Sequence, residues 1–285
     1  MYLEFLGLRE KPFSITADPN FLYLSKRHRE ALSHMLYGIQ ERKGFLEITG
    51  EVGTGKTTLC KALLRQLDAT TKSAFILHSN FSELQLLHTI VQDFGMNPLA
   101  NKLNLFNQLS DFLLEQAGAG RNIVLVIDEA QNMSPRLLEQ IRMISNFETD
   151  KEKLIQIVLV GQPQLREKLR LPSMQQLQQR IGVRYHITPL DLDEVRTYIE
   201  HRLRVAGADG SLAWTDDAIE EVYQCSKGIP RLINSICDRS LLACYVFRSK
   251  LVDQQIVRRS YQELMGEEVS TPSSEAQPAV GGVPA

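Results

Sequence analysis

The chain has 285 residues, enough to bury a sizeable core in one large domain or two smaller ones. Hydrophobic residues make up 43% and charged residues 23%, the balance of a soluble globular protein. The formal net charge of −2 does not indicate binding to nucleic acid or to an acidic membrane surface by the chain as a whole. Such binding would need a local basic patch. The apolar runs are too short to cross a bilayer, and the amino-terminal stretch lacks a signal-peptide pattern. We therefore expect a cytoplasmic protein whose attachment to the inner membrane, where it occurs, is made through a partner.

The amino-terminal quarter begins with aromatic residues mixed with turn formers. Residues 1–25 are expected to form an ordered irregular arm, because a disordered arm would carry fewer aromatic residues. Ser25 is a suitable N-cap for a helix over about 26–42. A short strand at Phe45–Thr49 and a helix from Lys56 to Leu67 follow.

Short apolar runs alternate with helical patterns as far as residue 189. The predicted strands are Ala74–Leu77, Ile123–Ile127, Leu154–Val160 and Arg184–Ile187, and the predicted helices cover 82–94, 103–117 and the segment that begins at Ser134-Pro135. The continuous β-branched run at Ile123–Ile127 is typical of a strand covered on both faces. This alternation predicts an α/β domain over 26–189, with helices on both faces of a parallel sheet.

The pattern changes after Pro189. Helices are predicted at about 191–206, 215–226, 230–247 and 253–265. They indicate a small all-helical lid domain over 190–266. Residues 267–285 lose apolar periodicity, are rich in Pro, Gly and Ser, and are predicted to be a disordered tail.

A phosphate-binding loop follows the first predicted strand. Residues 50–57 (GEVGTGKT) match the pattern G-x4-G-K-[ST], and a helix follows. Its glycines allow backbone N–H groups to turn toward phosphates, and the helix directs its positive end at them. The predicted nucleotide-binding residues are Gly50, Glu51, Val52, Gly53, Thr54, Gly55, Lys56, Thr57 and Thr58. Lys56 would reach the β- and γ-phosphates of ATP, and the Thr57 hydroxyl would hold Mg²⁺.

Two carboxylates end the central strand at Ile123–Ile127. Asp128 would orient the magnesium shell, and Glu129 would act as the general base toward the attacking water. The strand Leu154–Val160 ends close to Gln162, which would hydrogen-bond the γ-phosphate or that water. These residues predict ATP hydrolysis rather than phosphate binding alone. The alternative is structural: Asp128 and Glu129 would simply cap a strand, and Gln162 would be a turn residue.

Three arginines are candidates for completing the site. Arg180 lies near the expected far edge of the sheet, from where it would reach the nucleotide of a neighbouring subunit, and Arg184 competes for this role. Arg231 opens a helix of the lid and would fold over the γ-phosphate. The basic run 26–29 (KRHR) is a solvated helix start or a contact for the adenine side of the nucleotide or nucleic acid.

Taken together, these motifs resemble the AAA+ ATPase domain of the general secretion pathway protein A family. The resemblance covers nearly all of 1–265 and rests on FLGLREKPFSITADPNFLYLS, ITGEVGTGKTTLCKALL, VLVIDEAQNMSPRLLEQIRMISNFET, KLIQIVLVGQPQLREKL, QQRIGVRYHITPL and KGIPRLINSICDRSLLA. It implies that Gln162 is the sensor-1 residue, Arg180 the arginine finger and Arg231 the sensor-2 arginine. It also implies an oligomeric ATPase that assembles an envelope secretion or export complex. The chain looks like the short form associated with exopolysaccharide export and protein sorting, since no membrane span or peptidoglycan-binding domain is recognised in it.

Two other functions compete with this prediction. A DNA-associated ATPase of the transposition or origin-recognition type shares the same core, but the net charge is mildly negative and no winged-helix module fits after residue 265. A nucleotide-binding scaffold without turnover is the third possibility. Phosphate release by the wild type and by Glu129→Gln separates a scaffold from an enzyme.

Overall fold

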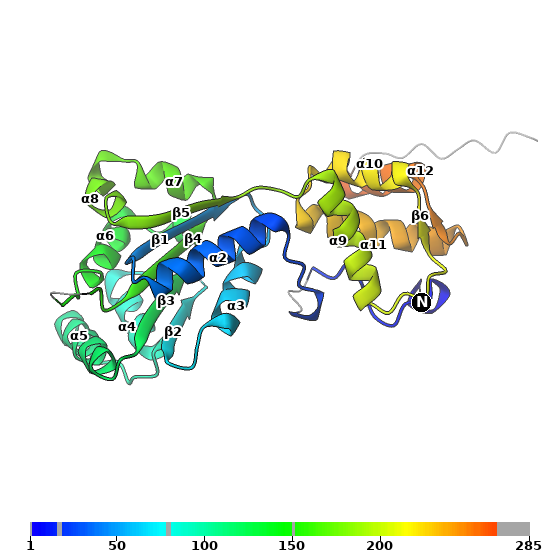
Figure 1. The fold of residues 1–285 in the computed structure, drawn as a ribbon. Coiled ribbons are helices and arrows are strands. Elements are labelled where there is room, and N and C mark those ends of the chain that lie inside the picture. Colours follow the sequence, from blue (N-terminus) through cyan, green and yellow to red (C-terminus); the bar gives the residue numbers. More distant parts are fainter. Residues whose placement is uncertain (1, 16–18, 78–80, 150–151, 267–285) are drawn as a thin grey trace, which may run out of the picture.

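The computed structural model describes residues 2–15, 19–77, 81–149 and 152–266. It has an α/β lobe and a helical lobe, which lie side by side in Figure 1. The chain passes between them twice, once ahead of α2 (Lys26–Gln40) and once between β5 (Ile181–Ile187) and α9 (Leu192–Val205). The predicted tail at 267–285 lies outside the described residues.

The α/β lobe contains a parallel five-stranded sheet with the order β2-β3-β4-β1-β5. The strands that accompany β5 are β1 (Phe45–Gly50), β2 (Thr71–Ile76), β3 (Asn122–Ile127) and β4 (Gln156–Gly161). Phe45 at the start of β1 pairs with Ile157 on one side and with Ile181 on the other. Parallel pairing places the carboxyl ends of β1, β3 and β4 at one edge of the sheet, where ligands bind in open α/β folds.

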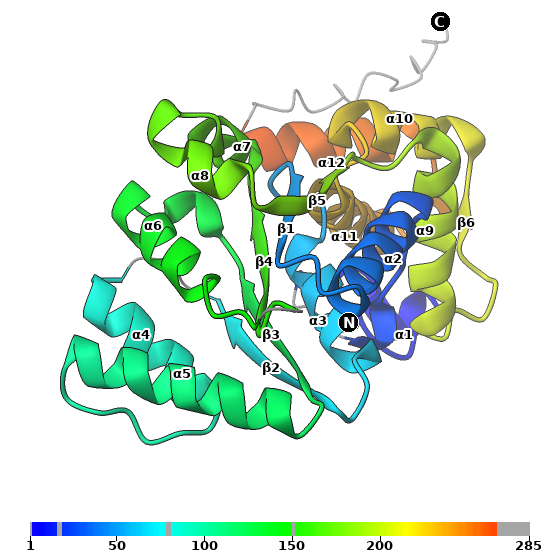
Figure 2. The same cartoon turned by 60° about the vertical axis from the view of Figure 1, so that its left-hand side comes forward.

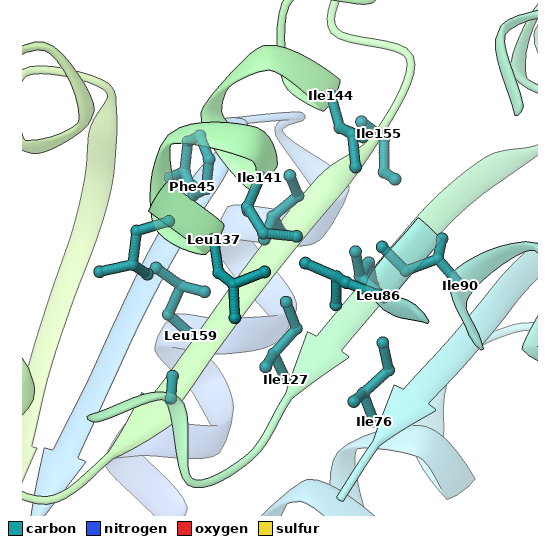
Figure 3. Packing of buried hydrophobic residues seen from close by; sticks show 14 of the residues in the cluster. Phe45, Ile76, Leu86, Ile90, Ile127, Leu137, Ile141, Ile144, Ile155 and Leu159 are labelled. Carbon is teal, nitrogen blue, oxygen red and sulfur yellow. The ribbon is translucent and has the colours of Figure 1, made fainter. Parts of the chain in front are cut away.

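Helices cover both faces of this sheet, as the strand patterns predicted. One face packs against α2 and α3 (Lys56–Gln66). The other face packs against α4 (Glu83–Asp93), α5 (Lys102–Gly118), α6 (Pro135–Ile144), α7 (Pro163–Leu169) and α8 (Gln175–Gln178). Figure 3 shows Leu137 and Ile141 of α6 over Ile127 and Leu159 of the central strands. Alternate residues of β3 and β4 face the two cores, so the strands carry unbroken apolar runs at Ile123–Ile127 and 157–160.

Local signals explain where the α/β helices begin. The Ser25 and Ser134 side chains accept hydrogen bonds from backbone N–H groups in the first turns of α2 and α6, and Pro135 occupies the first turn of α6. The sequence did not predict α7 and α8, which are too short to carry a periodic signal. They matter because they connect β4 with the edge strand β5.

The helical lobe consists of α9, α10 (Asp216–Ser226), α11 (Pro230–Val246) and α12 (Gln254–Met265), as the sequence indicated. Figure 1 shows α11 behind α9, and Figure 2 shows α10 along the top of this lobe, above α12. It also contains a two-residue parallel ladder between β6 (Ala213–Trp214) and β7 (Leu251–Val252), which the sequence did not predict. A pairing this short has no alternation to detect.

The amino-terminal arm packs into the helical lobe and belongs to its core. The arm contains the short helix α1 (Tyr2–Phe5) and the 3-10 turn η1 (Pro19–Phe21). Four of its apolar side chains join the same buried cluster as the residues of α9, α10 and α11: Leu6, Leu8, Phe13 and Phe21. Across the described ranges, no helix is long and apolar enough to span a membrane.

Candidate nucleotide site

The loop after β1 has the backbone shape that phosphate binding requires. Gly53 and Gly55 have φ angles of +82° and +90°, a left-handed region that residues with a Cβ rarely adopt. Gly55 directly precedes α3, so the positive end of that helix faces the loop. The loop and the helix start therefore fit a polyphosphate, as the motif predicted.

Lys56 is held against the loop it belongs to. Its Nζ donates hydrogen bonds of 2.8 Å to the backbone oxygens of Gly50 and of Glu51. Burial lowers the Lys56 pKa, while the nearby Glu129 and Asp128 carboxylates oppose the shift. The ammonium therefore sits between loop carbonyls and carboxylates, beside the place where phosphate oxygens would lie.

Thr57 and Asp128 meet although they lie 71 positions apart in the sequence. The Thr57 hydroxyl donates a 2.5 Å hydrogen bond to Oδ2 of Asp128, which is nearly inaccessible to solvent. Burial raises the Asp128 pKa, and the hydrogen bond from Thr57 opposes that rise. One hydroxyl and one carboxylate at the phosphate loop are the oxygen donors that Mg²⁺ uses with a nucleotide, so the residues fit this ion.

Glu129 has an unusual backbone and a clamped side chain. Its φ of 52° places a non-glycine residue in the left-handed region. Its Oε2 accepts hydrogen bonds from Gln131 Nε2 at 2.6 Å and from Gln162 Nε2 at 3.3 Å. The structure therefore brings Gln162, from the end of β4, to the carboxylate at the end of β3.

These groups line a cavity of about 380 Å³ between the two lobes. The α/β lobe contributes the phosphate loop from Val52 to Thr58, with Glu129 and Gln162. The arm and the lid contribute Phe21, Tyr23, Leu190, Tyr198, Arg202, Arg231 and Asn234, among others. The cavity is large enough for a nucleotide, and aromatic side chains are among its lining residues.

Arg231 lies where the lid touches the phosphate loop. Its backbone N–H donates a 3.3 Å hydrogen bond to the Gly53 carbonyl. A Cβ on Gly53 would lie 2.8 Å from the Arg231 Cβ, so only glycine permits this approach. The Arg231 side chain is exposed and lines the cavity, as a sensor of the γ-phosphate would be placed.

The other two arginines lie away from this cavity. Arg180 directly precedes β5, whose seven residues run toward the phosphate-loop end of the sheet, so about 20 Å of strand separates it from its own loop. Arg184 forms an ion pair with the buried Glu47 at 3.3 Å and donates to the Gln178 carbonyl. Neither side chain lines the nucleotide cavity of its own chain.

His28 contacts the phosphate loop, and the sequence did not predict this contact. Within the basic run 26–29 it alone is buried, and its Nε2 lies 2.7 Å from the Thr54 carbonyl oxygen. Its Nδ1 lies 2.8 Å from the Ser25 hydroxyl. Since a carbonyl can only accept, Nε2 carries the proton. Burial lowers the His28 pKa and so favours the neutral ring, in which Nδ1 accepts from Ser25. The spacing of Ser25 and His28 is the only sequence signal for this pair.

Gln131 is the second residue that sequence reasoning passed over. It lies in the quoted DEAQ stretch two residues after Glu129, but nothing local shows that its amide reaches back to that carboxylate. Gln131 also contacts Gln162 at the end of β4. That β4 lies beside β3 depends on the tertiary fold and cannot be read from the local sequence.

Comparisons with known proteins agree with this architecture. A family model described as "AAA domain" matches residues 39–169. General secretion pathway protein A of Aeromonas hydrophila is 45% identical over 265 residues, which make up 92% of this chain and 48% of that protein. The chain therefore spans about half the length of this relative.

Solved structures show the same fold at low sequence identity. The Aeropyrum pernix ORC2 protein, in ADPNP–ADP complexes, has a TM-score of 0.66 at 18% identity over 92% of this chain and 73% of its own. The Drosophila ORC bound to DNA has a TM-score of 0.67 at 18% identity over 89% and 64%. A mutant form of the Thermotoga maritima RuvB protein gives 0.57 at 17% identity over 91% and 74%. Similarity at such low sequence identity establishes a shared fold and does not establish a shared function.

Proposed function

Because the chain belongs to the AAA+ ATPase family and is a relative of general secretion pathway protein A, we propose that it binds ATP with Mg²⁺ and hydrolyses it to ADP and phosphate. The observation that carries this proposal is the convergence of Lys56, Thr57, Asp128 and Glu129 at one edge of the sheet. A phosphate loop alone binds nucleotide, whereas the two carboxylates beside it add a metal ligand and a base.

Each residue has one role in the proposed reaction. Thr57 and the water shell oriented by Asp128 would hold Mg²⁺, which would supply charge neutralisation at the phosphates. Lys56 leaves its loop carbonyls to bind the β- and γ-phosphates. Glu129 accepts a proton from the attacking water, and Gln162 and Arg231 bind near the γ-phosphate.

Replacement of Glu129 tests the enzyme directly. Glu129→Gln keeps the size of the side chain and removes the base, so we expect retention of ATP binding and a fall in kcat of about 10²–10⁴-fold. Phosphate release and binding of a fluorescent ATP analogue measure the two properties separately. Glu220→Gln, at an exposed position of α10, is the matched control and should leave both unchanged. Wild-type turnover no faster than that of Glu129→Gln would overturn the enzyme proposal.

We further propose that the chain oligomerises and that its turnover drives or regulates assembly of a bacterial envelope secretion or export complex. The support is the 45% identity to general secretion pathway protein A, whose name places that protein in secretion. The test is a pull-down with ATP and Glu129→Gln, which should trap the bound state. Recovery of envelope or secretion proteins with Glu129→Gln but not with Lys56→Ala supports this role. If neither variant recovers such proteins, the result opposes it.

A DNA-associated ATPase is the second candidate, and one observation favours it. The fold resembles ORC proteins, and one of those structures is bound to DNA. A gel-shift titration on duplex DNA, with ATP at low and moderate salt, decides between the two. A shift that weakens steeply with salt would favour DNA binding, and no shift at low salt would remove this candidate.

A further inference from the structure

Gln131 occupies a central place beside the proposed base. It lies in the short 3-10 turn Ala130–Asn132 that follows β3. Its side-chain Nε2 donates to Oε2 of Glu129 at 2.6 Å, and its Oε1 accepts from the backbone N–H of Gln162 at 3.0 Å. One amide thus joins the carboxylate at the end of β3 to the backbone at the end of β4.

The direction of this amide is fixed by its partners. An ionised carboxylate only accepts hydrogen bonds, and a backbone N–H only donates them. The opposite orientation of the Gln131 amide would place oxygen against carboxylate and NH₂ against N–H, and would lose both bonds. The side chain of Gln162 donates to the same Glu129 oxygen at 3.3 Å, so that Oε2 accepts from two amides.

The surroundings of Gln131 hold it in this position. A Cβ on Gly161 would lie 2.7 Å from Gln131 Oε1, so the absence of a side chain there makes room for the amide. Lys168 of α7 donates hydrogen bonds to the backbone oxygens of Gln131 and of Met133. The turn that carries Gln131 is therefore tied to β4 and to α7 as well as to β3.

We propose that Gln131 is a positioning residue that sets the rotation of the Glu129 carboxylate toward the attacking water. This role rests on the proposed hydrolysis. Glu129 has a left-handed backbone and lines the nucleotide cavity, and two hydrogen bonds to Oε2 fix the orientation of both its oxygens. Since displacement of a reacting group by about 1 Å can cost on the order of 100-fold in rate, loss of the Gln131 amide should lower kcat without lowering nucleotide affinity.

Gln131→Met is the first test, because methionine has a similar length and cannot donate to the carboxylate. We expect a fall in kcat of about 10–100-fold, with the dissociation constant for ATP within about 3-fold of wild type. Gln66→Met, at an exposed position of α3, is the matched control and should behave like wild type. An unchanged kcat in folded Gln131→Met would overturn the proposal. So would a loss of affinity equal to the loss of kcat, which indicates a general collapse of the site.

The readout that a purely structural role would not move is the split between the two constants. The positioning role lowers kcat, whereas the dissociation constant for ATP stays within about 3-fold of wild type.

The two levels of the proposal fail differently. Wild-type turnover equal to that of Glu129→Gln overturns the hydrolysis and this role with it. Clear wild-type turnover that Gln131→Met leaves intact overturns only the role of Gln131.

Discussion

The two lobes contribute to the site in different ways. In the α/β lobe the polar groups bond to one another across strands: Thr57 to Asp128, and Glu129 to the amides of Gln131 and Gln162. The helical lobe reaches the phosphate loop through Arg231, whose backbone binds the Gly53 carbonyl. The start of α2 also meets the helical lobe, because the Lys26 N–H donates to Glu194 of α9. A connected polar network preorganises reacting groups, and these few bonds between the lobes do not form such a network.

This difference indicates a division of labour. We propose that the α/β lobe holds its reacting groups in place and that the lid responds to the bound nucleotide. The lid is nevertheless built from both ends of the described chain, because the amino-terminal arm fills its core. Four changes test this comparison.

The largest expected effect tests whether the α/β lobe of one chain suffices for turnover or needs an arginine from a neighbouring chain. Arg180 lies at the amino end of β5, far from its own phosphate loop, and we propose that it acts on a neighbouring subunit. We expect Arg180→Ala to retain ATP binding and to lower kcat about 10³-fold, the loss typical of a missing arginine finger. Phosphate release by the variant, alone and mixed with Lys56→Ala chains, measures the effect.

The mixture distinguishes action between chains from action within one chain. In mixed oligomers an intact Arg180 from the Lys56→Ala chain can serve an intact loop of the other, so partial activity should return. Arg184→Ala is the matched comparison, since Arg184 is engaged with Glu47 and should matter less. Lack of rescue, or a greater loss with Arg184→Ala, would refute the assignment of Arg180.

Gly228 tests the connection between the lobes. It precedes α11 with a φ of +72°, and its Cβ would lie 1.9 Å from the carbonyl oxygen of Leu190. We expect Gly228→Ala to destabilise the protein by about 3 kcal/mol, because a backbone clash adds to the left-handed strain. Urea unfolding followed by circular dichroism measures this. Gly210→Ala, with a φ of +86° and nothing within 4 Å, isolates the strain and should cost about 1 kcal/mol. Equal effects of the two changes would contradict the clash.

Arg202 tests whether the lid depends on the arm. This buried side chain donates to the Pro12 and Ser14 carbonyls of the arm and to the Tyr198 hydroxyl within the lid. Arg202→Met should lose about 2 kcal/mol of stability, because three acceptors lose their charged donor. Trp214, the single tryptophan, packs edge-on against Phe13 and reports arm detachment by fluorescence. Arg204→Met, exposed on the same helix, is the control, and an equal loss there would argue against the arm contact.

The sequence predicted those parts of the site that are local in the chain. The glycine spacing of the phosphate loop and the carboxylates after an apolar strand follow from rules of backbone and strand geometry. The links between elements could not be predicted in this way. The bond from Gln131 to Gln162 depends on which strand neighbours β3, and the burial of Phe13 depends on helices nearly 200 residues later. No period or motif encodes such pairings.

His28 is expected to give the smallest effect. It lies in α2, directly after the arm, and its ring contacts the Thr54 carbonyl of the phosphate loop. Burial lowers its pKa from the usual value, while its bond to the Thr54 carbonyl and the charge of Glu194 oppose the shift. The unfolded chain binds a proton as the pH falls through about 6.5, whereas the folded chain does so only at lower pH. Stability is therefore complete above about pH 7 and decreases as the pH falls below about 6.5.

We expect His28 to account for about 1 kcal/mol of that loss between pH 7.5 and 5.5. Burial also lowers the pKa values of His186 and His201, so wild type must be compared with His28→Gln, which does not titrate. The free energy of unfolding, measured in urea at each pH, should fall more steeply with acid in wild type than in the variant. Parallel curves would show that His28 is protonated equally in the folded and unfolded chains. The neutral ring could not then be what supports the phosphate loop.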